Sequence, residues 1–482
     1  MHPRWLRASV SILTCAALLA CAACSSSPKP TDQKKKRTIL LTEHDDVRVG
    51  REASRDVAAE IGILEDPELT AYVGEIGRKL LRGVPRRSFQ YQFRVVDQFE
   101  PNAFALPGGF IFLSRGLLAL ANTEDELACV IGHEIVHAAQ RHAAAQQEIA
   151  KYGNPLAMPW NRAARLAAYG RDMERTADHG GQMLCAAAGY DPMGLSTLLD
   201  SLEQNQRLLV GYARRPSFFD THPGSQERAA VNAVRAREMR WTRDPALGDT
   251  SASYLRRIDG LALGQRPEGG VFDGDRFLHP DLDFQIRFPS GWQTSNSNRA
   301  VGAASPRGDA VVFLTADLPA GDPREVAESW LEKAREQQRV AVRESKPVKI
   351  GRLDAWRMRL EGSGAAGALT AYVTFIPYRE MTWRITGVSL SHTAGRYLGA
   401  TFNTVRSFRP LSEEERNSIQ ATRLRLARAR PGEDLVALSR RAGNAWDPSN
   451  TAIHNGIFAN HRFEGGELVK IAQVEPYTPR TP

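Results

Sequence analysis

The sequence is poor in cysteine and carries only a mild excess of one charge, and each shortage excludes a class of protein. Its 482 residues include five cysteines, three of which lie within the first 24 residues. The rest of the chain therefore has too few cysteines for a small fold held by a disulfide framework. The formal net charge is +8, and no stripe of Lys and Arg interleaved with aromatic residues stands out. A nucleic-acid-binding protein is not indicated.

Cys129 and Cys185 are the two cysteines of the remaining chain. Both lie in apolar segments with helical spacing. Such cysteines are typically buried, so we predict two buried free thiols. A single disulfide, formed in an oxidising compartment, is the alternative.

Long apolar runs are also scarce. After the first 20 residues, no segment offers the ~20 consecutive apolar residues that a membrane-spanning helix needs. The stretch 103–121 comes closest, but Pro107, two glycines and Arg115 interrupt it. Hydrophobic residues make up 42% of the chain and charged residues 24%, which is typical of a folded protein. At this length, about two to four domains are expected.

The N-terminal residues resemble a bacterial lipoprotein signal. Arg4 and Arg7 precede an apolar stretch, residues 8–20, that ends in Leu-Leu-Ala directly before Cys21. This pattern predicts that residues 1–20 are removed and that lipid is attached to Cys21, with Cys24 as a second candidate. An ordinary signal peptide followed by incidental cysteines is the alternative.

Residues 21–45 are predicted to be a flexible tether. They contain Ser, Pro and Lys residues at 25–30 and a run of three lysines at 34–36. A lipid-bearing tether of this kind predicts a protein of the bacterial periplasm that is anchored to the outer membrane.

Two histidines one helical turn apart are the most informative feature of the sequence. Thr123 with Glu126 three residues later forms the pattern of a capping box, so a helix is expected to begin here. Its apolar continuation reaches the sequence HEIVH. Residues i and i+4 share a helix face, so His133 and His137 present two imidazoles to one point, as zinc requires. Glu134 lies beside that point, where a general base for an attacking water must stand.

A third ligand is expected from another helix. Residues 167–177 show apolar positions at helical spacing, and Glu174 and Asp178 share a face of that helix. We assign Glu174 to the zinc, and Asp178 to a hydrogen bond that fixes the tautomer of a ligand histidine. A solvated acidic face, paired with Arg171 and Arg175, is the alternative.

Together these motifs resemble those of the gluzincin peptidases that include HtpX, the CAAX prenyl endopeptidases and the periplasmic BepA-like proteins. The resemblance covers about residues 47–242, including 102–109, a segment that the family places just before the strand lining its cleft. It implies a zinc metalloendopeptidase with one zinc per chain, polypeptide substrates, and Glu134 as the base. The lack of membrane spans points to the BepA-like branch.

The resemblance extends to a downstream loop, in which Asp-Thr-His222-Pro precedes Arg228. In BepA-like proteins, a loop histidine at the matching place can occupy the fourth zinc position and hold the enzyme inactive. The arginine six residues on is thought to stabilise the transition state. The resemblance implies these roles for His222 and Arg228, with a structural loop histidine as the alternative. His142 and His179 lie off the ligand face, so neither is expected to take part.

Substrate is expected to add as a strand to the segment 109–113, which we predict to be a sheet edge. Backbone pairing is weakly selective for sequence, so unfolded or unassembled polypeptides and quality control of outer-membrane proteins are predicted. The alternative is a cell-wall-anchored binding or assembly factor with little or no peptidase activity. A peptidoglycan amidase with the same zinc is a third hypothesis, which the BepA-like flanks disfavour.

The expected fold is multidomain α+β. The helix-rich zincin domain is assigned to residues 46–243, and a linker to 244–275. Residues 276–411 contain strand-like and helical segments and resemble the small α/β domains of the PsbP/Mog1 type. Residues 412–482 show a β-α-α-β order with a Pro431-Gly432 turn and resemble a LysM module. That resemblance implies binding to N-acetylglucosamine-containing glycans such as peptidoglycan, or a LysM-like fold without glycan binding.

Overall fold

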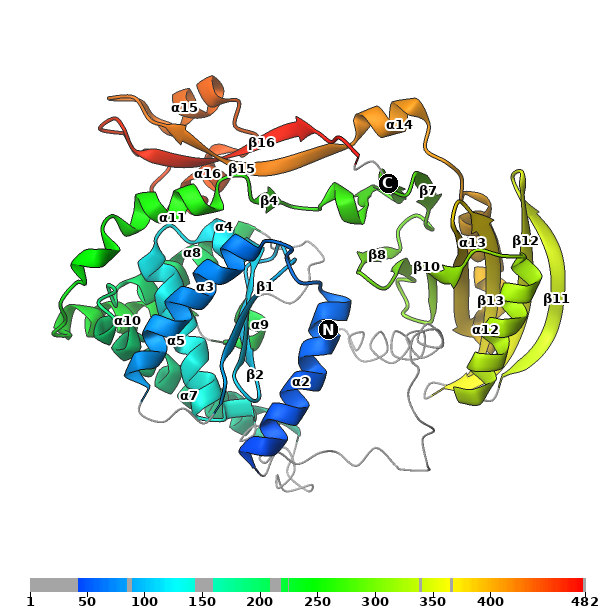
Figure 1. Cartoon of the computed structure of the whole chain (residues 1–482), viewed down its shortest axis with the longest axis horizontal. Coiled ribbons are helices and arrows are strands. Elements are labelled where there is room, and N and C mark those ends of the chain that lie inside the picture. Colours follow the sequence, from blue (N-terminus) through cyan, green and yellow to red (C-terminus); the bar gives the residue numbers. More distant parts are fainter. Residues whose placement is uncertain are drawn as a thin grey trace. The chain divides into compact units, whose positions relative to one another are not determined.

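The computed structural model describes residues 42–84, 89–143, 159–208, 218–223, 225–337, 340–364 and 367–479 (Figure 1). The predicted signal peptide and both candidate lipidation sites, Cys21 and Cys24, lie outside these residues. The described residues form two compact units. We call residues 42–265 together with 421–475 the helical unit, and residues 266–420 together with 476–479 the sheet unit.

The helical unit contains most of the helices of the chain. Its elements up to residue 265 are α2 (Glu43–Glu60), α3 (Pro67–Leu80), η2 (Leu81–Gly83), β1 (Gln92–Val96), β2 (Ala103–Leu106), β3 (Phe110–Ser114), α4 (Arg115–Leu120), α5 (Glu124–Ala139), α7 (Pro159–Ala187), α8 (Gly194–Leu208), α9 (Phe218–Thr221), α10 (Ser225–Glu238), η3 (Pro245–Leu247), α11 (Thr250–Ile258) and β4 (Ala262–Leu263). Its C-terminal elements are β15 (Gln420–Arg428), α15 (Leu435–Ala442), α16 (Pro448–His454) and β16 (Leu468–Pro476).

A three-stranded sheet stands beside the helices, and its order is β1-β3-β2. β3 pairs in parallel with β1 and antiparallel with β2, and every residue of β3 is buried. The prediction that 109–113 forms a sheet edge is therefore wrong. A continuous apolar run such as Phe-Ile-Phe-Leu fits a strand covered on both faces, and the outer strand on that side is β2.

α5 begins as predicted at Thr123, whose hydroxyl accepts a hydrogen bond from the amide of Glu126 at 3.1 Å. The reciprocal half of the capping box is not made. The Glu126 carboxylate instead accepts bonds from the amide of Asn122 (2.6 Å) and the hydroxyl of Thr197 (2.8 Å). The bond from Thr197 joins the start of α5 to α8.

Cys129 and Cys185 form a disulfide between α5 and α7, so the prediction of two free thiols is wrong. The physical reason is the close crossing of the two helices. A Cβ on Gly132 would lie 2.9 Å from the carbonyl oxygen of Gly181, so only glycine fits there. This approach brings the Cα atoms of the two cysteines to 5.5 Å, a separation that a disulfide can bridge.

The predicted β-α-α-β order is present at the C-terminus, as β15, α15, α16 and β16. These elements share a compact unit with residues 42–265, which the predicted boundary at residue 412 did not anticipate. β15 pairs with β4, so the sheet order is β16-β15-β4. The ammonium of Lys470, on β16, is fully buried and donates to the carbonyl oxygens of Ala119, Leu120 and Ala121 at 2.7–2.9 Å. It thereby caps the last turn of α4.

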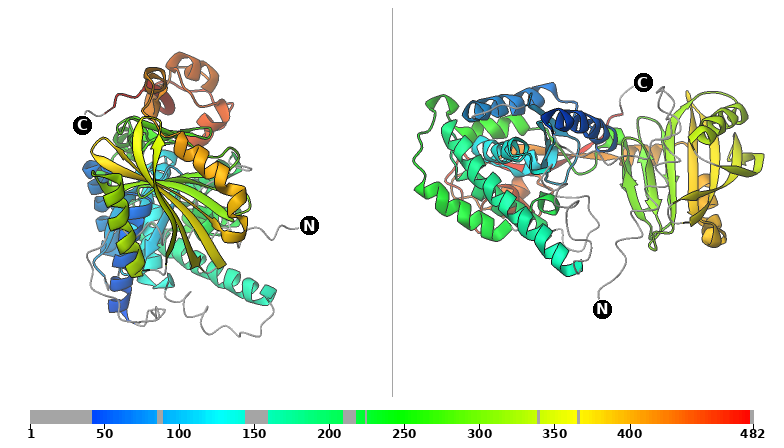
Figure 2. Two further views of the ribbon diagram at one scale, coloured as in Figure 1. Left: turned by 90° about the vertical axis from the view of Figure 1, so that its right-hand side faces the viewer. Right: turned by 90° about the horizontal axis from the view of Figure 1, so that it is seen from below.

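The sheet unit contains two antiparallel sheets, one of three strands in the order β5-β6-β7 and one of seven in the order β11-β12-β13-β14-β10-β9-β8. α12 packs on one face of the larger sheet through Trp330, and α13 packs on the other through Val405 (Figure 2). The elements are η4 (Pro267–Gly269), β5 (Val271–Asp273), β6 (Arg276–His279), β7 (Phe284–Arg287), β8 (Gln293–Asn296), β9 (Val301–Ala304), β10 (Ala310–Pro319), α12 (Pro323–Gln337), β11 (Ala341–Ile350), β12 (Leu353–Gly364), β13 (Gly367–Tyr378), β14 (Met381–Leu390), η5 (Ser391–Thr393), α13 (Ala394–Arg406) and α14 (Glu413–Ser418).

The described helices can be checked for membrane-spanning segments. None of them combines the length and the apolar character needed to cross a bilayer. The multidomain α+β fold class is confirmed at this coarse level.

Candidate metal centre

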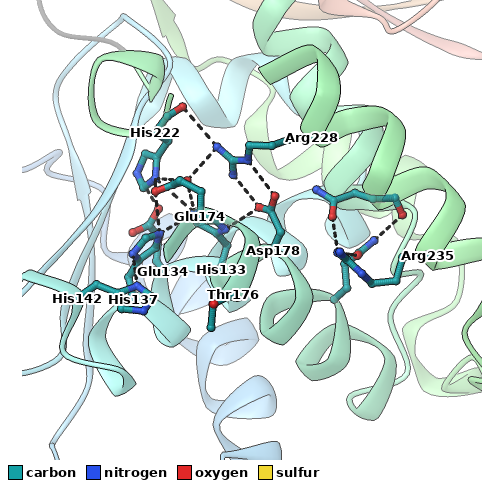
Figure 3. A network of polar contacts seen from close by, with 12 residues as sticks. His133, Glu134, His137, His142, Glu174, Thr176, Asp178, His222, Arg228 and Arg235 are labelled. Atoms are coloured by element: carbon teal, nitrogen blue, oxygen red, sulfur yellow. Dashed lines mark hydrogen bonds and ion pairs between the residues drawn. The ribbon is translucent and has the colours of Figure 1, made fainter. Parts of the chain in front are cut away.

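Four side chains from three segments converge in the helical unit (Figure 3). His133 and His137 lie one turn apart on α5, and their Nε2 atoms are 3.0 Å apart. Glu174 on α7 places its carboxylate oxygens 3.5 Å from Nε2 of His133 and 3.3 Å from Nε2 of His137. With His222, one donor atom from each residue lies within 4.8 Å of every other.

This donor set fits zinc. Two imidazoles and one carboxylate are ligand types that zinc takes, at bond lengths of about 2.0–2.2 Å. In a tetrahedron with such bonds, the ligand atoms stand about 3.3 Å apart. The separations of 3.0, 3.3 and 3.5 Å among His133, His137 and Glu174 agree with that value. The close crossing of α5 and α7 is what brings the three together.

Asp178 lies beside the first histidine. Its Oδ1 lies 3.0 Å from Nδ1 of His133, the nitrogen that faces away from the other ligands. Arg228 holds Asp178 in turn through a two-bond fork, from Nε at 2.8 Å and from Nη2 at 2.6 Å. A carboxylate in this place fixes the tautomer of a ligand histidine and raises its basicity.

Arg228 also touches the ligand set directly. Its Nη1 lies 2.9 Å from a carboxylate oxygen of Glu174 and 3.4 Å from the backbone carbonyl oxygen of His222. The side chain is buried, and these contacts bind it to a ligand, to the partner of a ligand and to the loop. The geometry therefore shows Arg228 as a group that holds the site together.

His222 reaches the centre from the end of α9. Its Nδ1 lies 3.1 Å from both oxygens of Glu174 and 3.3 Å from Nε2 of His133. Its ring stacks on the ring of Phe218, with centroids 4.3 Å apart. Only 5% of the residue is exposed. The loop thus comes within bonding distance of the ligands, which the sequence could not establish.

Glu134 lies beside the ligands on α5 and is fully buried. Its Oε1 is 3.4 Å from Nε2 of His222. Neither carboxylate oxygen has a hydrogen-bond partner among the residues that the structure describes. Burial raises the pKa of Glu134, which makes it a stronger proton acceptor than an exposed carboxylate.

The charges of the site suit a divalent cation. Burial opposes ionisation of Glu174, but His222, His133 and His137 outweigh it and hold the pKa of Glu174 far below its ordinary value. Burial likewise opposes ionisation of Asp178, and hydrogen bonds from Arg228 and His133 lower the pKa of Asp178 overall. Both carboxylates are therefore ionised at neutral pH.

The two ligand histidines differ in their proton affinity. Burial lowers the pKa of His137 to about 3, so its imidazole is neutral. Burial also opposes the charge of His133, but hydrogen bonds to Asp178 and Glu174 more than offset it and raise the pKa of His133 to about 9. A metal must therefore displace a proton from His133, and its binding should weaken as the pH falls.

His142 joins the site, contrary to the prediction that it takes no part. Its Nδ1 lies 2.9 Å from Nδ1 of His137. The prediction placed His142 off the ligand face of the helix, but α5 ends at Ala139 and Arg141 has a φ of +54°, so the chain turns back. His179 is exposed.

Part of the chain is similar to known metallopeptidases. Residues 67–237 match the model of Peptidase family M48. The chain is 28% identical over 219 residues to the beta-barrel assembly-enhancing protease of Escherichia coli (strain K12), covering 40% of this chain and 44% of that protein. It is 28% identical over 200 residues to the mitochondrial metalloendopeptidase OMA1 of Schizosaccharomyces pombe, covering 38% of this chain and 58% of that protein. The chain thus spans less than two thirds of either relative.

Likeness among solved structures is weak. The solution structure of cyanobacterial PsbP from Synechocystis superposes with a TM-score of 0.24 at 10% identity, over 31% of this chain and 99% of that one. This likeness carries no weight for the predicted PsbP-type domain. The family match and the convergence of His133, His137, Glu174 and His222 support a zinc metallopeptidase region, in which these four residues could hold the zinc.

Proposed function

We propose that this chain is a metalloendopeptidase that cleaves misfolded or unassembled polypeptides in the cell envelope. The proposal starts from the match of residues 67–237 to Peptidase family M48. One observation carries the proposal. The ligands on α5 and α7 converge, and the buried carboxylate of Glu134 stands next to them without a hydrogen-bond partner among the described residues. A base in this position serves hydrolysis, whereas a purely structural zinc site has no use for one.

The residues of the chain divide the chemistry among them. Zinc held by His133, His137 and Glu174 supplies Lewis acidity, which acidifies water and polarises a peptide carbonyl. The Glu134 carboxylate accepts the proton of the attacking water and delivers it to the leaving amine nitrogen. Arg228 keeps the Glu174 carboxylate in place. The predicted role of Arg228 in transition-state stabilisation stays a prediction, and it would require Nη1 to leave Glu174.

The position of His222 supports an inactive state, in which its imidazole blocks the fourth ligand position of the zinc. Its Nδ1 lies as close to Glu174 and His133 as a fourth ligand would, and its Nε2 faces Glu134. An imidazole there occupies the space between the base and the ligands that an attacking water needs. We infer that His222 restrains the enzyme until its loop moves.

The substrate would pair with β2. This strand is the outer member of its sheet and packs against α5, which carries the ligands. A peptide added alongside Ala103–Leu106 would be bound through its backbone, with little dependence on its sequence. Chains that have not yet folded offer such extended segments. The names of the bacterial relatives suggest that unassembled β-barrel proteins are among them.

The cellular setting is part of the same proposal. Lipid on Cys21 would hold the chain at a membrane, and the periplasm would be its compartment. The C-terminal elements of the helical unit would bind peptidoglycan, since Phe458, in the loop after α16, is 83% exposed and offers a ring for stacking on a sugar. Retention of the full chain on peptidoglycan sacculi, compared with Phe458→Ser, tests this part. Equal retention of the two proteins would count against it.

The central test compares Glu134→Gln with the wild type. The variant keeps the shape of the side chain but loses its basicity, so zinc content should stay the same while casein digestion falls by at least about 100-fold. His179→Gln, an exposed substitution on α7, is the matched control and should keep wild-type activity. Digestion by Glu134→Gln within tenfold of the wild type would favour the alternative of a binding or assembly factor, with another protein causing the digestion.

A further inference from the structure

We propose that α2 is a positioning element of the metal centre, acting through Asp46, Arg141 and His142 on the ligand His137. The inference rests on the proposed function, because it assigns His137 to the metal. It adds three residues that neither the motif nor its spacing contains. Each link is a direct contact in the structure.

The last link is the contact between His142 and His137. Their Nδ1 atoms are 2.9 Å apart, so one of the two must donate a proton to the other. Nε2 of His137 faces His133 and Glu174, and as a metal ligand this nitrogen carries no proton. The proton of His137 then sits on Nδ1 and is donated to Nδ1 of His142.

This arrangement gives each ligand histidine its own acceptor. Nδ1 of His133 faces the carboxylate of Asp178 at an ion-pair distance of 3.0 Å, and Nδ1 of His137 is hydrogen-bonded to the imidazole of His142 at 2.9 Å. Such an acceptor fixes both the tautomer and the ring orientation of a ligand. His142 is buried, so water does not readily replace it in this role.

The contact between His142 and His137 depends on the turn at Arg141, which directs His142 toward His137. α5 ends at Ala139, and Arg141 adopts a φ of +54°. This left-handed conformation is disfavoured for every residue except glycine and, to a lesser degree, Asn and Asp. Arginine therefore needs an external contact to hold it there. Without the turn, His142 would move away from His137.

That contact comes from Asp46 in the first turn of α2. Its two carboxylate oxygens lie 2.5 Å from Nε and 3.1 Å from Nη2 of Arg141, a two-bond fork. Only 2% of Asp46 is exposed, whereas 30% of the Arg141 side chain is. A carboxylate that is so buried depends on its partner and keeps it in place.

α2 itself packs closely against the turn between β2 and β3. A Cβ on Gly50 would lie 1.8 Å from the carbonyl oxygen of Pro107, and a Cβ on Gly108 (φ +80°) would lie 2.6 Å from the Cα of Val47. Backbone therefore meets backbone where α2 crosses the turn between β2 and β3. α2 thus lies against the strand β2 (Figure 1). The contact of Asp46 with Arg141 joins α2 to the turn that follows α5.

The first test measures how fast a chelator removes zinc from the purified holoenzyme. Asp46→Asn and His142→Leu should each release zinc about 10- to 100-fold faster than the wild type, the usual cost of losing a hydrogen-bond partner of a ligand. His142→Asn keeps an acceptor oxygen near the place of Nδ1 and should restore most of the retention. Glu52→Gln, the same change of charge at an exposed position of α2, should match the wild type.

The second test separates the turn from the ion pair. Asp46→Asn/Arg141→Gly and Asp46→Asn/Arg141→Ala both lack the ion pair, but only glycine accepts a φ of +54° without strain. The glycine double variant should therefore keep zinc longer than the alanine one. Cobalt(II)-substituted proteins give a second readout, because the visible spectrum reports the geometry of the ligands.

Two results would overturn the inference. One is a wild-type rate of zinc release from His142→Leu and Asp46→Asn, each with wild-type circular dichroism. The other is equal zinc release from the glycine and alanine double variants. Neither result depends on peptidase activity, so the inference and the proposed function fail separately. A Glu134→Gln enzyme that remained active would refute the function and leave the zinc-release comparison intact.

Discussion

Replacing His222 with alanine is the most informative single perturbation of this site. His222 is held by its contact with the Glu174 carboxylate and by stacking on Phe218. A hydrogen bond to a charged group contributes about 1.5–3 kcal/mol, and an aromatic pair about 0.5–1.5 kcal/mol. Ordering the loop residue costs roughly 1–2 kcal/mol in conformational entropy. These ranges sum to at most about 3.5 kcal/mol in favour of the position of His222 at the ligands, and their middle values give about 2 kcal/mol, so we work with about 1–3 kcal/mol.

That free energy sets the size of the expected effect. Each 1.4 kcal/mol is a factor of about ten in the inactive-to-active ratio, so His222→Ala should raise activity by about 5- to 150-fold. Zinc should remain bound, because His133, His137 and Glu174 do not change. Self-cleavage should rise together with the cleavage of added substrate.

The assay is digestion of fluorescently labelled casein at equal zinc content, with the metal measured on the same samples. His179→Ala, an exposed histidine on α7, is the matched control and should behave as wild type. An activity of His222→Ala below that of the wild type at equal zinc content would refute the restraint. His222 would then be a contact of the substrate or of the transition state.

The remaining predictions concern metal, stability and pH. His133→Ala should lose most of the bound zinc, as measured by elemental analysis, because two ligands hold the metal poorly. Replacing Cys129 and Cys185 with alanine should lower the free energy of unfolding by up to about 4 kcal/mol, from the 56-residue separation that the disulfide closes, and denaturant titration should show this. Lys470→Met should cost about 1–3 kcal/mol in the same assay, since buried carbonyl oxygens lose their donor. Hydrogen bonds from an arginine lower the pKa of Glu415 to about 2, so its stabilising effect is complete above pH ~4.5 and is lost as the pH falls toward 2. In Glu415→Gln, the melting temperature should therefore fall less between pH 6 and pH 3 than in the wild type.

The sequence by itself determined the parts of the site that lie within one helix. The spacing of His133 and His137 decides that their imidazoles share a face, because a helix repeats every 3.6 residues. The same local rule places Glu134 beside them and lets Thr123 start the helix. Glu174 and Asp178 were found in the same way, one turn apart on a second helix.

Only the tertiary structure decided which segments meet. Cys129 and Cys185 pair because two glycines let α5 and α7 cross closely, and no local pattern predicts that crossing. β3 is central because strands pair on both sides of it. Lys470 and Ala119 are 351 residues apart, yet a buried ammonium needs acceptors wherever the fold supplies them. His142 reaches His137 only because Asp46 holds the turn at Arg141. Local geometry fixes the direction of a side chain, whereas contacts between distant segments depend on how the whole chain packs.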